Sequence, residues 1–248
     1  MLRKRYIITL TFNDGVLFRT KGFVPDYRYT ANFVDAWSID EIVLLDITRP
    51  GEGRKESLYE AVQEFARRSF VPLAVGGGVR TIEDVRTLLS LGADKVVVNT
   101  QALREPDFIG QIAGLYGSQC AVVSIDALRH DDGSYEVMAE YGQKPTGLDP
   151  AAWARTAQQK GAGEIFLTSV DRDGSLEGYD NELNAQVAEA VQIPVIVSGG
   201  AGKWQDLVDG FQIGHASAVS TSCIYHFTES SIRSAKNYLK NQRILVRA

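Results

Sequence analysis

The stretch VPLAVGGG (Val71–Gly78) returns 122 residues later as IPVIVSGG (Ile193–Gly200). At the same spacing, Gly92–Lys95, which precedes a run of valines, returns as Gly214–Ser217 before a second strand-like run. A repeat this long, and in step over two separate segments, indicates two copies of one half-domain.

Each half contributes four short, nearly continuous apolar runs, the pattern of strands buried on both faces. The expected strands are Tyr6–Thr11, Glu41–Asp46, Pro72–Val75, Lys95–Asn99, Ala121–Asp126, Glu164–Thr168, Pro194–Ser198 and Ala216–Thr221. Eight such strands alternating with helices in about 250 residues are typical of a (βα)8 TIM barrel. An open, doubly wound sheet is the alternative. The repeat favours the barrel, because two four-stranded halves close into a symmetric ring.

We place the half-repeats at roughly residues 1–115 and 116–248 of one domain, since no linker or low-complexity segment interrupts the chain. Two helices have clear start signals. One is Ile82–Leu91 behind Thr81, and the other is Pro150–Lys160 with Asp149 as its cap. Between Thr30 and Asp40 there is room for only about two helical turns. The first unit of the barrel is therefore expected to be short or irregular.

Composition narrows the function further. The chain is 44% hydrophobic and 23% charged, with a net charge of −5, which argues against a general nucleic-acid binder. No apolar run reaches the roughly 18 residues of a membrane span, and no signal peptide is evident. The two cysteines, Cys120 and Cys223, have no metal or redox spacing. We expect a reduced, cytoplasmic setting and neither a metal nor a cofactor.

Glycines and hydroxyl residues gather where barrel strands end, which is where such barrels bind ligands. Gly76–Gly78 follows strand three and Gly199–Gly202 follows strand seven, while Asn99-Thr100 and Thr221-Ser222 end strands four and eight. Glycine lets backbone N–H groups approach an anion closely. Two matching phosphate sites are the natural hypothesis, and tight βα turns are the alternative.

Four carboxylates also follow strands: Asp46, Asp126, Asp171 and Asp173. A carboxylate in a barrel mouth can serve as a general acid or base. Asp126 is the best candidate, because an apolar strand leads directly into it. A capping role is its alternative, and a plain turn is the alternative for Asp173. The counterpart of Asp126 in the first half is Thr11.

The opposite end of the barrel carries charge. Arg5, Glu41, Lys95 and Glu164 stand at or near the starts of strands one, two, four and six. If they point inward, they form a closed ring of two positive and two negative groups. Buried charges are costly unless they are paired. The residues alone favour a salt-bridged plug over a gate.

Taken together, the chain resembles the cyclase subunit family of imidazole glycerol phosphate synthase, from histidine biosynthesis. The similarity covers essentially the whole chain. Its motifs are Gly76–Arg80, Gly92–Lys95, Gly117–Cys120, Lys144–Gly147, Leu167–Gly174 and Ser198–Lys203. The resemblance implies a (βα)8 barrel that docks a glutaminase subunit on its N-terminal face. Ammonia then passes through the barrel to a bisphosphate substrate on the C-terminal face.

The resemblance also implies roles for single residues. The ring of Arg5, Glu41, Lys95 and Glu164 matches the family's ammonia gate, which reverses the preference for a plug. Asp126 matches one of two catalytic aspartates. The positions expected to hold the substrate's phosphates are Gly78, Asn99, Thr100, Asp173, Gly174, Gly200, Thr221 and Ser222.

The chain departs from the family in its first unit. The second catalytic aspartate falls at Thr11, whose hydroxyl is no base near neutral pH, and the loop lysine falls at Arg19. The segment Arg19–Asp40 is also shorter than the family's. This pattern resembles the paralogues found with surface-polysaccharide enzymes, in which ammonia is thought to serve the conversion of a sugar acetamido group to an acetamidino group.

The leading hypothesis is an ammonia-channelling partner of a glutaminase, whose own cyclase chemistry is weakened or lost. The first alternative is an authentic cyclase with a relocated base, for which Asp14 is the nearby carboxylate. The second alternative is a non-catalytic scaffold that binds a sugar phosphate or activates its glutaminase.

Overall fold

The computed structural model describes residues 3–28, 39–53, 55–222 and 232–247, and its centre is a ring of eight parallel strands. In chain order these barrel strands are β1 (Arg5–Asn13), β4 (Glu41–Asp46), β5 (Leu73–Gly76), β6 (Lys95–Val98), β7 (Ala121–Arg129), β10 (Glu164–Ser169), β11 (Val195–Ser198) and β12 (Ala218–Thr221).

The ring is closed, because each of these strands pairs with a parallel neighbour on both sides. The halves join where β6 pairs with β7 and where β12 pairs with β1, and the pairing of β10 with β7 completes the second half. The predicted (βα)8 barrel is thus confirmed. An open sheet would leave two barrel strands with an unpaired edge.

The predicted strand limits agree with the observed ones within two residues, with one exception. The predicted strand Ala121–Asp126 continues to Arg129, because its last residues pair with an additional antiparallel strand. Buried apolar runs therefore located the strands well, whereas the extension depends on a partner strand that such runs do not reveal.

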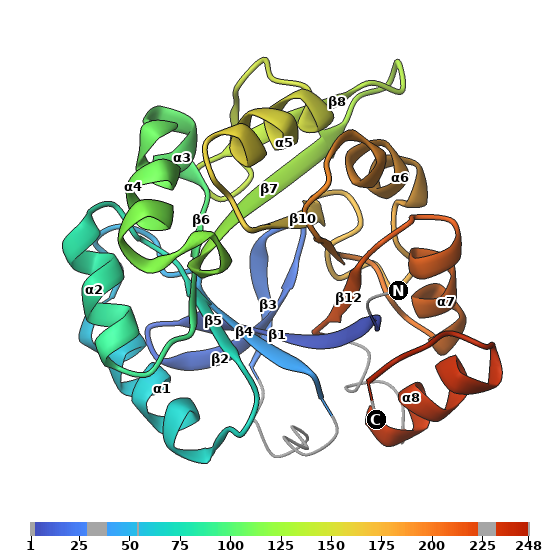
Figure 1. Ribbon diagram of the computed structural model, residues 1–248, viewed down its shortest axis with the longest axis horizontal. Coiled ribbons are helices and arrows are strands. Elements are labelled where there is room, and N and C mark those ends of the chain that lie inside the picture. The colour runs from blue at the N-terminus through green and yellow to red at the C-terminus, as the bar shows by residue number, and fades with distance from the viewer. Residues whose placement is uncertain (1–2, 29–38, 54, 223–231, 248) are drawn as a thin grey trace.

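Helices form the outer layer around the barrel (Figure 1). They are α1 (Lys55–Arg68), α2 (Ile82–Ser90), α3 (Thr100–Arg104), α4 (Asp107–Tyr116), α5 (Pro150–Gln159), α6 (Asn181–Ala190), α7 (Trp204–Gln212) and α8 (Ile232–Asn241), with a 3₁₀ turn η2 at Ser118–Cys120. In the described part of the chain, no helix is long and apolar enough to cross a membrane.

The two predicted helix starts are confirmed. The Thr81 hydroxyl accepts a hydrogen bond from the Asp84 N–H, and the Asp84 carboxylate accepts one from the Thr81 N–H, which together make a capping box. Asp149 caps α5 by accepting from the Ala152 N–H. The short helical segment expected between Thr30 and Asp40 lies almost entirely outside the described residues.

Each half of the barrel carries an antiparallel hairpin after its first strand. β2 (Val16–Lys21) and β3 (Val24–Arg28) follow β1, and β8 (Tyr135–Ala139) and β9 (Lys144–Pro145) follow β7. We did not predict either hairpin. The first had a signal, since Asp14 and Gly15 form a two-residue turn with φ of 46° and 75°. Asp-Gly is among the dipeptides that favour such a turn.

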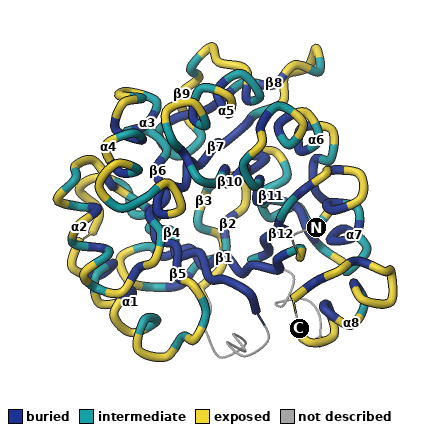
Figure 2. Tube along the Cα trace, viewed as in Figure 1, coloured by how far each residue is buried: buried dark blue, intermediate teal, exposed yellow. Residues whose placement is uncertain are grey.

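The core has two parts, and the barrel strands are the most deeply buried elements (Figure 2). The larger part packs between the strands and the helices. The smaller part fills the barrel interior with one residue from each strand: Ile7, Val43, Ala74, Val97, Val122, Phe166, Ile196 and Ala218. We call this set the apolar layer.

The two ends of the described chain meet beside the start of β1. The Lys4 N–H donates to the Leu245 carbonyl over 2.9 Å, and Lys4 forms a parallel bridge with Val246. Both ends therefore lie on the N-terminal side of the barrel.

Candidate functional site

The barrel interior is arranged in levels, because side chains on one face of a strand recur every second residue. Arg5, Glu41, Lys95 and Glu164 begin β1, β4, β6 and β10 and form the lowest level. Two residues further along those strands stand four members of the apolar layer, Ile7, Val43, Val97 and Phe166. A single apolar level therefore separates the charged residues from the barrel mouth.

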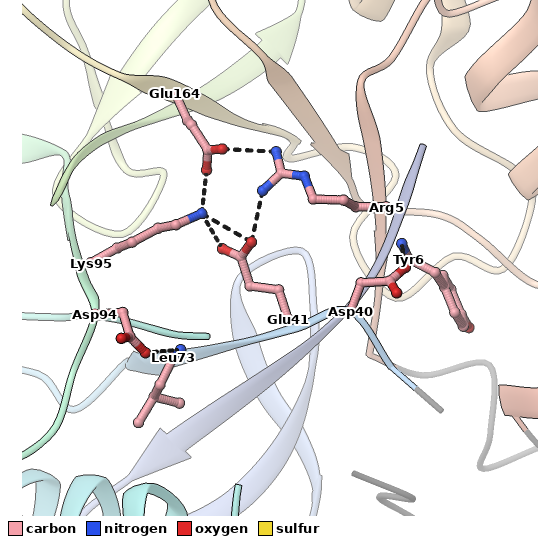
Figure 3. Close-up of polar contacts among 8 residues, drawn as sticks. All are labelled: Arg5, Tyr6, Asp40, Glu41, Leu73, Asp94, Lys95 and Glu164. Carbon is pink, nitrogen blue, oxygen red and sulfur yellow. Dashed lines mark hydrogen bonds and ion pairs between the residues drawn. The ribbon is translucent and has the colours of Figure 1, made fainter. Parts of the chain in front are cut away.

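We call the four charged residues the floor ring, and they pair in a closed circuit (Figure 3). Arg5 Nη1 lies 2.7 Å from Glu41 Oε2, and Arg5 Nη2 lies 2.8 Å from Glu164 Oε1. Lys95 Nζ lies 2.9 Å from Glu41 Oε1 and 2.8 Å from Glu164 Oε2. Each cation thus touches both carboxylates, and each carboxylate touches both cations.

The floor ring is shielded from water. Its side chains are between 2% exposed, for Glu41, and 15% exposed, for Lys95. Burial alone would lower the pKa of Arg5, but attraction to Glu164 and Glu41 outweighs it, so the pKa of Arg5 is raised. With two positive and two negative groups, the ring is neutral as a whole and mutually satisfied. It closes the floor in this structure.

Above the apolar layer, the barrel mouth contains a cavity of about 600 Å³. Phe166 and Val97 form part of its bottom, and hydroxyl and amide side chains form its next level. The polar residues of the lower wall are Thr9, Thr11, Asn99, Ser124, Asp126, Thr168 and Ser198. A cavity of this size accommodates a small-molecule ligand.

Asp126 lies in this wall, on β7, and is 9% exposed. Asn99 Nδ2 donates to Asp126 Oδ2 over 2.7 Å, and Ser124 Oγ donates to Asp126 Oδ1 over 3.2 Å. Burial raises the pKa of Asp126 to about 7, and repulsion from Asp173 adds to this, against the two hydrogen bonds. Asp126 is therefore poised to take up or release a proton near neutral pH.

This pKa gives a stability prediction for the Asp126→Asn variant. The pKa of an aspartate in the unfolded chain is about 3.9. Wild-type stability should therefore fall as pH rises from about 4 to about 7, because the unfolded chain releases a proton that the folded chain retains. One pKa unit is worth about 1.4 kcal/mol. We expect Asp126→Asn to be more stable than wild type by about 2–4 kcal/mol at about pH 8, and nearly equal at about pH 4.5.

Urea unfolding at the two pH values measures this difference. Equal stability of variant and wild type at the higher pH would contradict the assignment of a buried, ionised carboxylate at this position.

Thr11 faces the same cavity but is engaged elsewhere. Its hydroxyl donates to the Phe18 carbonyl of β2. Asp14 is exposed in the β1–β2 turn, accepts a hydrogen bond from Ser57 Oγ and is not part of the cavity wall. Asp46 does line the cavity, and burial raises its pKa against hydrogen bonds from Thr48. Of these two carboxylates, Asp46 lines the cavity and Asp14 does not.

The other two strand-end carboxylates, Asp171 and Asp173, lie in different surroundings. Asp173 lines the cavity, and burial raises its pKa against hydrogen bonds from Phe23 and Thr20. Asp171 is exposed and instead accepts from the Arg129 N–H over 2.8 Å. Arg19 stands on β2, where its Nε lies 2.9 Å from Asp26 Oδ2 within the same hairpin. The role of Arg19 as the counterpart of the family's loop lysine remains a prediction.

The expected phosphate-binding residues fall into two groups. Gly78, Asn99 and Thr100, which we call the first nest, all line the large cavity. The remaining residues line a separate pocket of about 10 Å³, and we call them the second nest: Asp173, Gly174, Gly200, Thr221 and Ser222. Asp173 and Ser222 belong to the walls of both spaces.

Sequence reasoning missed the cations of the large cavity. Arg49, Arg80 and Arg104 line it, together with Tyr141. Arg49 lies over the Tyr141 ring, 5.5 Å from its centroid. Arg80 could have been found, because it stands two residues after the first glycine run. The others come from loops and a helix whose positions only the fold reveals.

Comparison with known proteins places this geometry in a family. The family described as "Histidine biosynthesis protein" matches residues 10–230, which include seven barrel strands in full and the last four residues of β1. The family consists of histidine-biosynthesis barrel enzymes, in agreement with the closed barrel and the buried polar cavity at its mouth. The chain belongs to the histidine biosynthesis protein family.

Proposed function

We propose that this chain is the cyclase-like barrel subunit of a glutamine amidotransferase complex of the imidazole glycerol phosphate synthase type. It receives ammonia from a glutaminase at the floor and releases it into the mouth cavity. The ammonia then serves sugar amidation in surface-polysaccharide synthesis, and the chain's own cyclase activity is weakened or lost. The observation that carries the proposal is that the floor ring, the apolar layer and the mouth cavity with Asp126 follow one another along the barrel interior.

The route suits ammonia in its neutral form. The apolar layer offers no charge or hydrogen bond to an ion, and transfer of an ammonium ion into such surroundings is costly. The floor ring provides an entry if a cation–carboxylate contact opens, because Lys95 carries its charge on a flexible stem. Ammonia would then meet Asn99 and Asp126 at the base of the cavity.

The N-terminal face of the barrel, where the floor ring lies, also resembles a docking surface for a protein. Four large apolar side chains are exposed on it: Phe70 (74%), Leu115 (61%), Ile213 (57%) and Leu245 (67%). The first three precede β5, β7 and β12, and Leu245 lies beside Lys4 at the start of β1. Apolar side chains gathered around one face favour a protein partner there. This supports a glutaminase on the N-terminal face.

Thr11 supports the loss of cyclase chemistry. Its hydroxyl is bound to a backbone carbonyl, and it could not accept a proton near neutral pH in any case. A phosphorylated small-molecule substrate is in keeping with the family and with the first nest and its arginines. We assign Asp126 as the remaining acid–base group, the two nests as phosphate-site candidates and Arg19 as the loop cation.

An authentic cyclase of histidine biosynthesis is the second candidate. The observation in its favour is Asp46, a second carboxylate with a raised pKa in the cavity wall. Such a pair could divide the acid and base roles.

The test is turnover of the histidine-pathway bisphosphate intermediate by the purified chain with excess ammonium salt, which bypasses the partner. We expect no turnover by wild type. Turnover by Thr11→Asp, which restores a second carboxylate beside the cavity, would assign the loss of cyclisation to that one residue. Wild-type turnover would instead establish an authentic cyclase, with Asp46→Asn as the next variant. If neither protein turns over, Thr11 alone does not account for the loss of cyclisation, and the altered segment after β1 has changed the substrate.

An experiment with a purified histidine-pathway glutaminase distinguishes the scaffold alternative from an ammonia channel. A scaffold would bind and activate the glutaminase, yet glutamine-dependent amidation would persist when the floor ring is altered by Arg5→Ala. A channel requires that coupling to fall.

A further inference from the structure

The two candidate phosphate sites differ in the space available to a ligand, which the sequence repeat does not predict. The first nest opens into about 600 Å³, whereas the second nest encloses about 10 Å³. A space of this size holds about one water molecule, and a phosphate has five non-hydrogen atoms. We infer that the β2–β3 hairpin occupies the approach to the second nest, so that the cavity takes a substrate with one phosphate, seated in the first nest. This inference rests on the proposed phosphorylated substrate.

The hairpin is bound to the second nest by three hydrogen bonds to one residue. Thr20 Oγ1 donates to Asp173 Oδ1 over 3.0 Å, and the Phe23 N–H donates to Asp173 Oδ2 over 2.9 Å. The Gly22 N–H donates to the Asp173 carbonyl over 3.1 Å. Both carboxylate oxygens of Asp173 are therefore already engaged by the tip of the hairpin.

Close packing accompanies these bonds. A Cβ atom added to Gly174 would overlap the carbonyl oxygen of Thr20, so the backbone of the second nest directly adjoins the hairpin backbone. On the other side of the tip, the Phe23 ring packs at the position where Gly142 lacks a side chain. Gly142 belongs to the β8–β9 turn, so the hairpins of the two halves meet over the mouth.

The hairpin tip is shaped for this position. Gly22 and Phe23 have φ of 57° and 63°. A bulky residue with positive φ is an outlier that persists only when its surroundings hold it. Here the backbone N–H of Phe23 is bound by Asp173 and its ring by the opposite turn. The docked hairpin is therefore a built contact and not an incidental one.

Charge separates the two nests further. Arg49, Arg80 and Arg104 line the large cavity that holds the first nest, together with the carboxylates of Asp46, Glu52, Asp126 and Glu140. Among the described residues that line the second nest, there is no lysine or arginine, and the one charged side chain is the carboxylate of Asp173. The arginines can neutralise a doubly charged phosphate in the large cavity, whereas the described lining of the second nest offers no cation to do so. Size and charge therefore select the same nest.

The test counts phosphate sites on the purified chain, with inorganic phosphate as the probe. Equilibrium dialysis gives the number of sites, and crystals soaked in phosphate give their positions. We expect one site in wild type, at the first nest, and loss of that site in Gly78→Asp. Gly78 has open space around it, and its φ of 63° strains any side chain, but aspartate less than most, so the added carboxylate can stand beside the nest and repel the anion.

The double variant Thr20→Val/Phe23→Pro should show two sites. Valine removes the hydroxyl donor, and proline removes an N–H and cannot adopt the φ of Phe23. Tyr27→Ala is the matched control, because Tyr27 is 60% exposed on the same hairpin, and it should keep one site.

Two equivalent sites in wild type, or one site in the double variant with its hairpin released, would overturn this inference and leave the proposed function intact. Absence of any phosphate site in wild type would overturn both. Hydrogen exchange of residues 16–28 shows whether the hairpin is released.

Discussion

Replacement of Asp126 by alanine should lower ammonium-dependent cyclisation by about 10²–10⁴-fold, the usual contribution of a general acid or base. The effect is expected in whichever protein shows turnover, wild type or Thr11→Asp. Asp126 is the buried carboxylate that Asn99 and Ser124 orient at the base of the cavity, and its pKa of about 7 suits proton transfer at neutral pH. Steady-state rates of the two proteins, with and without the alanine substitution, measure the loss.

A suitable control is Asp171→Ala. Asp171 is also a carboxylate just beyond a barrel strand, but it is exposed and caps the Arg129 backbone N–H. Its loss should change the rate less than about twofold, as expected for a group outside the cavity. If Asp126→Ala behaves like this control, Asp126 is not the acid–base group.

Replacement of Glu41 by glutamine should destabilise the fold by about 3–5 kcal/mol, the usual cost of removing one partner from a buried ion pair. Glu41 is the least exposed member of the floor ring and contacts both Arg5 and Lys95. Its neutralisation leaves two buried cations and only Glu164 to balance them. For a chain of 248 residues, this corresponds to a fall in melting temperature of roughly 10 °C.

Glu83→Gln provides the comparison for the same chemical change. Glu83 pairs with Arg86 on α2, with both side chains more than half exposed. Exposed pairs contribute about 0–1 kcal/mol, so the melting temperature should shift by no more than about 3 °C. Equal shifts for the two variants would mean that the floor ring is hydrated and exchanges its partners freely.

The fold could be predicted because the relevant signal is local and repeated. Strands such as Glu41–Asp46 are buried on both faces and therefore appear as continuous apolar runs. The floor ring could also be predicted from the sequence. Charged residues at the starts of buried strands have no solvent to face and must therefore pair with one another. Asp126 followed from its place at the end of such a strand.

The features of the site that we did not predict depend on contacts between segments that are distant in the sequence. The inequality of the two nests arises where Thr20 and Phe23 meet Asp173, about 150 residues further along the chain. No periodicity within either segment records that meeting. Arg49 and Arg104 likewise enter the cavity through the placement of a loop and of α3. The Asp14-Gly15 turn shows that one hairpin signal was present in the sequence and was overlooked.

The meeting of the two chain ends beside β1 has a practical consequence for handling the protein. Lys4 and Val246 lie against each other on the face that carries Leu245, so an affinity tag or fluorescent fusion at either end would project from that same face. Such a label would compete for space with the proposed glutaminase. The turn between β7 and β8, at residues 130–134, is exposed for the most part and lies on the opposite side, which makes it the better position for a label in any binding experiment.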